Sequence, residues 1–317
     1  MAVNSDKPHL WKADIARSVD QFNRWFMESA PTAFRQIRAQ TTKDVLAALT
    51  LTRDHLAIEP STFRAHPEVL PTLRMSTCPP IAVDRLVGLS GVGKNLVLSM
   101  DRSGKLPPRT LAPDLENQLG RICRIISRLI DPDLFPWVAD RVAPTAVQRA
   151  RAASVVADRL CGALTNPIVR NAQEKRQLAM IDQYLRKRGY RPAARKAGRP
   201  LTDMEPRTYS FRTNVVVGSI RKVNIPIDVV IQPQRLGRNR FPLLVEAKSA
   251  GDFTNTNKRR KEEATKVHQL RDTYGPGVAL ILFLCGYFDG GYLGYEAAEG
   301  IDWIWEHRIT DFEQLGI

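Results

Sequence analysis

Two short segments with the composition of β-strands carry charged side chains inside otherwise apolar sequence. Residues 222–232 read KVNIPIDVVIQ, and residues 241–250 read FPLLVEAKSA. Asp228 in the first segment, and Glu246 and Lys248 in the second, interrupt runs that a folded protein would bury. Burying an ionised carboxylate is costly unless an opposite charge compensates it, and a divalent cation is the usual solution. The pattern therefore indicates a metal site with an amine beside it.

The spacing of these residues allows them to meet. Side chains two apart on a strand point to the same side, so Glu246 and Lys248 share a face while Ala247 turns away. The chain between Asp228 and Glu246 is long enough for a polar turn through residues 235–240 and a return strand, which places the two carboxylates side by side. With the backbone carbonyl of Ala247 they form a set of hard oxygen ligands suited to Mg²⁺. A metal there would stabilise charge on a phosphate, and Lys248 would orient or help deprotonate the attacking water.

The elements that must position these residues lie in the C-terminal half of the chain. Between the last two strand-like runs, apolar residues step at helical spacing, which predicts a crossover helix joining two parallel strands. The order of elements indicates an α/β fold of the α+β kind, with a mixed sheet flanked by helices. The predicted strands are residues 208–217, 222–232, 241–248 and 278–287, and the predicted helices are residues 170–188 and 256–274.

The N-terminal half has helical periodicity instead. Apolar residues fall three or four apart in two stretches, which predicts two amphipathic helices whose stripes face a core. A third helix is predicted at residues 145–164. We therefore predict a helical domain over residues 1–165 and a second domain, which carries the charged site, over residues 166–317. The two stripes are Trp11, Ile15, Val19, Phe22 and Phe26, and Leu115, Leu119, Ile122, Ile126 and Leu129.

The chain is strongly basic, with 47 Lys and Arg against 33 Asp and Glu, a net charge of +14 and a pI near 9.9. Such a surface attracts polyanions, and nucleic acid is the obvious partner, although charge alone also fits an anionic membrane or plain solubility. Two basic clusters, residues 186–199 and 258–261, could dock on phosphates and add affinity without sequence preference. Each cluster taken singly also fits a solvated face or a localisation tag.

The remaining composition points to the cytoplasm. The N-terminal residues lack the apolar core of a signal peptide, and the longest apolar run, residues 278–285, is far shorter than the roughly 20 residues that cross a bilayer. The four cysteines have no CxxC spacing and stand among apolar neighbours, so we expect buried thiols in a reducing compartment. The five histidines are not paired at zinc-ligand spacing either. We therefore expect a cytoplasmic protein with no membrane partner.

The charged motif resembles that of a known group of enzymes. Pro226-Ile227-Asp228 followed by Glu246-Ala247-Lys248 resembles the PD-(D/E)XK nuclease signature, including the proline two positions before the first acid. Residues 245–263, VEAKSAGDFTNTNKRRKEE, together with the helical N-terminal half, look like the XamI-type restriction endonucleases in particular.

This resemblance implies a restriction-endonuclease-like sheet and a homodimeric type II enzyme that hydrolyses both strands of double-stranded DNA with Mg²⁺. It implies a short palindromic target as well, with GTCGAC associated with the family's namesake. Domain 166–317 would then be the nuclease, and the helical domain would serve DNA recognition or dimerisation.

Other residues are weaker candidates. Glu174, in the helix before the sheet, matches a position where such nucleases sometimes place an acid that touches metal through water, although a surface Glu beside Lys175 is the plainer interpretation. Asn255 and Asn257 carry amides that can contact bases or backbone. The residues predicted to contact DNA are Arg186, Lys187, Arg188, Arg191, Arg195, Lys196, Asn255, Asn257, Lys258, Arg259, Arg260 and Lys261.

Residues 88–95, GLSGVGKN, come within one residue of the P-loop pattern for nucleotide phosphates. A working P-loop needs Ser or Thr after the lysine to hold magnesium, and Asn95 occupies that place. The preceding segment carries Asp84 and Arg85 where a buried strand is required. We therefore predict a glycine-containing turn between two helices and no nucleotide cofactor.

Two other functions compete with a restriction enzyme. A non-specific or repair nuclease of the PD-(D/E)XK type would use the same residues, but it would reduce a plasmid to a smear instead of discrete bands. A non-catalytic DNA-binding protein would bind tightly without cleavage in Mg²⁺. That second alternative leaves the charges inside two apolar strands unexplained.

Overall fold

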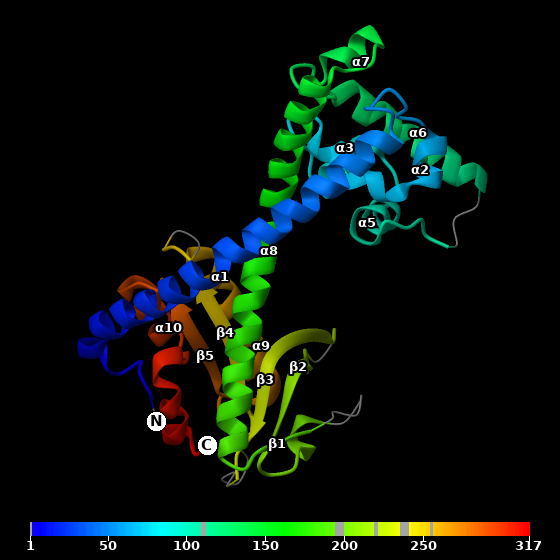
Figure 1. Ribbon diagram of the computed structural model, residues 1–317. Coiled ribbons are helices and arrows are strands. Elements are labelled where there is room, and N and C mark those ends of the chain that lie inside the picture. The colour runs from blue at the N-terminus through cyan, green and yellow to red at the C-terminus, as the bar shows by residue number, and fades with distance from the viewer. Residues whose placement is uncertain (1, 109–111, 194–199, 219–220, 235–240, 254–255) are drawn as a thin grey trace. The chain divides into compact units, whose positions relative to one another are not determined.

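The chain folds into two compact units (Figure 1). The sheet unit comprises Met1–Ala30 and Val169–Ile317, and the helical unit comprises Pro31–Ile168. The chain passes from one unit to the other inside two long helices, α1 (Pro8–Leu51) and α8 (Ala146–Lys187). The computed structural model describes residues 2–108, 112–193, 200–218, 221–234, 241–253 and 256–317.

The sheet unit is built on a six-stranded sheet whose strands lie side by side in chain order (Figure 1). The strands are β1 (Arg191–Pro192), β2 (Thr208–Val217), β3 (Val223–Gln232), β4 (Leu243–Ala250), β5 (Leu280–Gly286) and β6 (Asp302–Trp305). Strands β2, β3 and β4 pair antiparallel, whereas β1 with β2, and β4 to β6 among themselves, pair parallel. The four predicted strands correspond to β2–β5, and the predicted mixed α/β fold class is confirmed.

Helices cover both faces of this sheet. On one face lie the predicted crossover helix α9 (Thr256–Tyr274) and α10 (Gly290–Ala298), whose Val267, Leu270 and Leu293 are fully buried against β3–β5. On the other face lie the C-terminal half of α8 and the 3-10 helix Glu306–Leu315, through Ile181, Leu185 and Phe312. A parallel strand covered on both faces has no polar side, and all residues of β5, LILFLCG, are buried.

The first thirty residues belong to the sheet unit, although the sequence places them in the helical domain. Asn4 donates from Nδ2 to the carbonyl of Trp303 at 2.9 Å, and Ser18 Oγ accepts the N–H of Gly286 at 2.8 Å. Trp11 also packs on the apolar core of the sheet. Local periodicity predicts a helix here, but it cannot predict which remote surface the helix covers.

The helical unit has two adjoining apolar clusters. One is built around Leu70, Leu86 and Ile122, and the other around Val45, Phe135 and Trp137. Besides parts of α1 and α8, its helices are α2 (Pro60–Ala65), α3 (Leu70–Met75), α4 (Val83–Ser90), α5 (Lys94–Ser103), α6 (Ala112–Leu129) and α7 (Pro136–Asp140), with a 3-10 turn at Pro67–Val69. A further 3-10 turn, Leu201–Asp203, lies in the sheet unit.

The P-loop-like segment forms the predicted turn between two helices. Gly91 ends α4 in the left-handed region at φ +60°, a conformation that glycine adopts without steric cost. Val92 is buried, and Gly93 precedes α5. No strand precedes this turn among the described residues.

The two predicted helices 145–164 and 170–188 are one continuous helix, α8, so the predicted separation of these helices is wrong, although Pro167 lies between them. A proline inside a helix removes one backbone hydrogen bond and usually kinks or ends it. Here tertiary packing holds both halves, because Ala152, Val156 and Leu160 are buried on one side of the proline and Ile181 and Leu185 on the other.

Two smaller expectations also need correction. Phe26 is 43% exposed, so it does not belong to the buried stripe predicted for this segment. Cys78 is exposed, whereas Cys123, Cys161 and Cys285 are buried free thiols as expected. Among the described residues, no helix is both long and apolar enough to span a membrane.

Candidate active site

The structure brings Asp228 and Glu246 together on neighbouring strands. Strands β3 and β4 pair with Val229 opposite Val245, and the same register continued by one residue places Asp228 opposite Glu246. The backbone N–H of Ala247 donates to Asp228 Oδ2 at 2.8 Å. The predicted cross-strand meeting of the two carboxylates therefore occurs.

Lys248 completes the predicted group. Its ammonium lies 3.4 Å from Glu246 Oε2, and its side chain is 25% exposed. A second carboxylate, Glu263 of α9, lies 3.5 Å from the same nitrogen. Lys248 is therefore held between an acid of its own strand and an acid of the covering helix.

Lys266 of α9 is a second cation at this site. Its Nζ donates to Glu246 Oε1 at 2.8 Å and to the carbonyl of Pro226 at 3.1 Å. Glu246, only 4% exposed, is thus compensated by two ammonium groups. Lys266 escaped the sequence analysis, although it follows Glu263 by three residues on a predicted helix and so shares a face with it.

The electrostatics of the site follow from burial and from these neighbours. The pKa of Asp228 is raised to about 6, first by burial and then by the carboxylate of Glu246, while the N–H of Ala247 and the ammonium of Lys248 act to lower it. Burial acts to lower the pKa of Lys248, but the carboxylates of Glu246, Glu263 and Asp228 outweigh burial, and the pKa is raised. Lys248 is therefore an ammonium ion at neutral pH.

These residues fit a hard divalent cation. In the described part of the chain, no three His, Cys, Asp or Glu side chains cluster as a metal site, and the two predicted side-chain ligands are Asp228 and Glu246. Two carboxylates suffice for Mg²⁺, which usually keeps several waters, and the carbonyl of Ala247 is the predicted third protein ligand. The raised pKa of Asp228 reflects burial and like-charge repulsion that a cation would relieve.

Glu174 lies near this group without touching it. It acts on the pKa of Asp228 only as a minor electrostatic influence, and Arg212 of β2 holds its carboxylate at 3.1 Å. Gln177, one turn further along α8, donates from Nε2 to the carbonyls of Lys248 at 3.3 Å and Phe283 at 3.1 Å. The helix that carries Glu174 thus supports the backbone of the site.

The sequence as a whole settles which proteins this chain is related to. The profile of the XamI restriction endonuclease family matches residues 53–305. The chain belongs to the XamI restriction endonuclease family. The type II restriction enzyme SalI of Streptomyces albus G is 54% identical over 314 residues, with 99% of each chain covered. No solved structure matches.

The resemblance to the XamI-type restriction endonucleases is therefore confirmed. So is the class of enzyme, a type II site-specific deoxyribonuclease, and double-stranded DNA as the substrate. The catalytic, metal-binding and DNA-contacting residues of this XamI-family enzyme remain predictions.

Several predicted DNA contacts of the XamI-family chain are engaged within the molecule. Arg186 pairs with Asp182 at 2.8 Å, and Arg188 pairs with Glu313. The guanidinium carbon of Arg260 lies 4.8 Å from the centre of the Tyr295 ring. Lys187, Arg191 and Lys261 are exposed. Three of the predicted contacts lie outside the described residues: Arg195, Lys196 and Asn255. Three more lie in the first turn of α9, and the side chains of that turn are not described: Asn257, Lys258 and Arg259.

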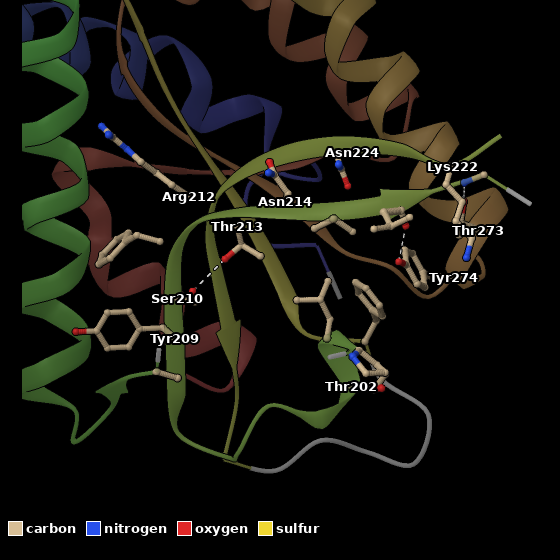
Figure 2. Close-up of a pocket in the computed structure, with 18 of the residues that line it drawn as sticks. Thr202, Tyr209, Ser210, Arg212, Thr213, Asn214, Lys222, Asn224, Thr273 and Tyr274 are labelled. Atoms are coloured by element: carbon tan, nitrogen blue, oxygen red, sulfur yellow. Dashed lines mark hydrogen bonds between the residues drawn. The ribbon is translucent and has the colours of Figure 1, made fainter. Parts of the chain in front are cut away.

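A groove of about 1230 Å³ runs along the β2–β3 hairpin of this family member (Figure 2). Its polar lining includes Arg212, Asn214, Lys222 and Asn224, which follow the hairpin one after another in Figure 2. None of the three predicted catalytic residues is among its described lining residues. Arg212 nonetheless connects the groove to Glu174, beside the candidate active site.

Proposed function

We propose that this XamI-family enzyme cleaves both strands of DNA at a short palindromic site with Mg²⁺ held by Asp228, Glu246 and the carbonyl of Ala247. The observation that carries the proposal is the meeting of the buried carboxylate of Glu246, the half-buried carboxylate of Asp228 and an ammonium group at adjoining positions of β3 and β4. Glu174 would touch the metal through water. Similarity to SalI and the family resemblance favour GTCGAC as the target.

When bound, Mg²⁺ would stabilise negative charge on the phosphate and lower the pKa of a coordinated water. Asp228 and Glu246 bind and orient that ion. The ammonium of Lys248, at the edge of the same site, orients the attacking water and stabilises the charge that develops as the water oxygen bonds to phosphorus and the bond to the leaving sugar oxygen breaks. The water loses its proton to solvent, and the leaving oxygen takes a proton from solvent. The charged form of Lys248 favours orientation over proton abstraction.

The enzyme would act as a homodimer, since a two-fold symmetric site on DNA is matched by two copies of one chain, each cutting one strand. It would do so in the cytoplasm. Exposed apolar side chains in the sheet unit, Phe26 at 43%, Met27 at 71% and Phe253 at 45%, offer a surface for such pairing. Light scattering of the free protein and of its complex with target DNA tests this stoichiometry. A single chain per duplex would contradict it.

The helical unit would add contacts to DNA through α4 and α5. Two helices joined by a short glycine-containing turn form a recurrent DNA-binding arrangement, in which the start of the second helix meets the DNA. Lys94 and Asn95, at the start of α5, are exposed. Lys94 pairs with Asp84 at 3.0 Å, but both side chains are largely solvated, so a phosphate can replace that weak partner.

Replacing Asp228 or Glu246 by Ala should abolish cleavage, by about a thousandfold or more, while DNA binding in Ca²⁺ stays largely intact, because these acids hold the metal and not the phosphates. The purified protein is incubated with mixed plasmid DNA and Mg²⁺, and the fragment ends are sequenced. Discrete bands whose ends, joined in pairs, restore GTCGAC support the whole proposal. Undiminished cleavage by either variant removes that residue from the metal site, and a smear excludes site-specific cutting.

A further inference from the structure

Behind the predicted catalytic lysine lies a second layer of acids that the mechanism above does not use. Glu263 of α9 is 1% exposed and Glu296 of α10 is 0% exposed. Two fully buried carboxyl groups next to each other are costly unless their protons and partners are arranged to compensate. The groups that surround Glu263 and Glu296 therefore determine which of the two carboxyl groups carries a proton.

Glu263 faces donors on two sides. One carboxylate oxygen lies 3.5 Å from the ammonium of Lys248, and the other accepts the hydroxyl of Tyr292 at 2.6 Å. An ammonium and a phenol hydroxyl both stabilise an ionised carboxylate. Glu263, on the helix α9 that covers the strand β4, is thus the buried counter-ion of Lys248.

Glu296 faces Glu263 from α10. Among the described residues, neither of its oxygens meets a hydrogen-bond donor, so as an ionised carboxylate it would be both buried and unsatisfied. Burial, followed by the neighbouring carboxylate of Glu263, raises the pKa of Glu296 to about 9, against weaker opposing effects of Lys248 and Arg260. At neutral pH Glu296 is therefore a carboxylic acid, and its O–H can donate to Glu263.

We propose that Glu263 is a positioning residue for cleavage: held from behind by Tyr292 and Glu296, it fixes the ammonium of Lys248 beside Glu246. The proposal rests on the proposed role of Lys248. Without Glu263, the amine would keep the carboxylate of Glu246, on its own strand, as a partner. It would lose the buried carboxylate on α9 that limits its movement. Misplacement of a catalytic group lowers the chemical rate more than substrate affinity.

The test compares isosteric variants in the full-length enzyme with target DNA and Mg²⁺. Glu263→Gln keeps the shape but removes the charge, and we expect the single-turnover rate to fall about 10- to 100-fold with unchanged DNA affinity. Glu296→Gln replaces one neutral donor by another, so the rate should fall by less than about threefold at pH 7.5. Tyr292→Phe removes one oxygen and should give an intermediate loss. Glu299→Gln is the matched control, because Glu299 is the C-cap residue of α10 and pairs with His268 away from Glu263.

A pH series separates positioning from a merely structural role. As pH rises through about 9, Glu296 ionises beside Glu263 and can no longer donate a hydrogen bond to it. The wild-type cleavage rate should then fall relative to that of Glu296→Gln. The ratio of the variant's single-turnover rate to the wild-type rate should rise severalfold between pH 7.5 and 9.5. A constant ratio would overturn the proposed proton on Glu296. Full activity of folded Glu263→Gln would overturn the positioning role. If Lys248→Ala also cleaves normally, the proposed function itself fails; if it is silent while Glu263→Gln is active, only this inference fails.

Discussion

At the scale of single residues, Asp228 is placed for function at the expense of stability. The pKa of Asp228 is raised to about 6 by burial and by Glu246, so its carboxyl binds a proton more readily in the folded chain than in the unfolded one. Its ionised form is then unfavourable in the folded, metal-free protein. The contribution of Asp228 to the free energy of unfolding should fall as pH rises from about 4 to about 6 and stay at the lower value above that range.

Asp228→Asn should therefore stabilise the metal-free protein while it prevents cleavage. At pH 8 we expect a gain of about 1 to 2 kcal/mol after allowance for partial solvent screening, and no gain at pH 4, where the wild-type carboxyl is largely protonated in the folded state. Thermal denaturation in EDTA at both pH values measures the difference. A destabilised variant at pH 8 would mean that Asp228 is a structural acid whose partners outweigh its burial.

At the scale of elements, α8 connects the site to the rest of the sheet unit. Its Gln177 is 1% exposed and bridges the carbonyls of Lys248 and Phe283, on the neighbouring strands β4 and β5. A buried carbonyl left without a donor costs about 1–3 kcal/mol. The same contact also fixes the backbone that carries Lys248.

Gln177→Ala should lower the free energy of unfolding by about 1–3 kcal/mol and slow cleavage as well. Lys175→Ala, an exposed position on the same helix, serves as the control. Urea unfolding and single-turnover cleavage are measured on both. Equal stability of the two variants would show that the bridge contributes nothing.

At the scale of the whole molecule, the net charge of +14 predicts strong, salt-dependent binding to any DNA. Part of this charge lies in the helical unit, where Lys94 is exposed at the start of α5. A residue that contacts phosphate contributes affinity to all sequences alike, whereas a residue that reads a base edge changes specificity.

Lys94→Ala should weaken binding to target and non-target DNA by similar factors, and it should reduce the slope of log Kd against log salt by about 1. Fluorescence anisotropy in Ca²⁺ over a range of salt concentrations measures both effects. Lys43→Ala removes an exposed cation from the same unit and is the control. Indistinguishable curves for the two variants would exclude α5 from the DNA path.

The sequence by itself determined the local features of this enzyme. Alternating and helical periodicities predicted β2–β5, α6 and α9, because the faces that these elements bury impose those spacings on neighbouring residues. The charges at Asp228, Glu246 and Lys248 were visible for the same reason, since they interrupt apolar runs. Their spacing was also enough to predict that the two acids meet.

The tertiary structure alone decided which remote residues surround that motif. Lys266 and Glu296 were not singled out from the sequence, because a charged residue on a helix has the same appearance whether it faces solvent or a buried site. The continuity of α8 through Pro167 and the placement of residues 2–30 in the sheet unit depend likewise on long-range packing. Packing partners distant in the chain outweigh local propensity, and one sequence does not reveal them.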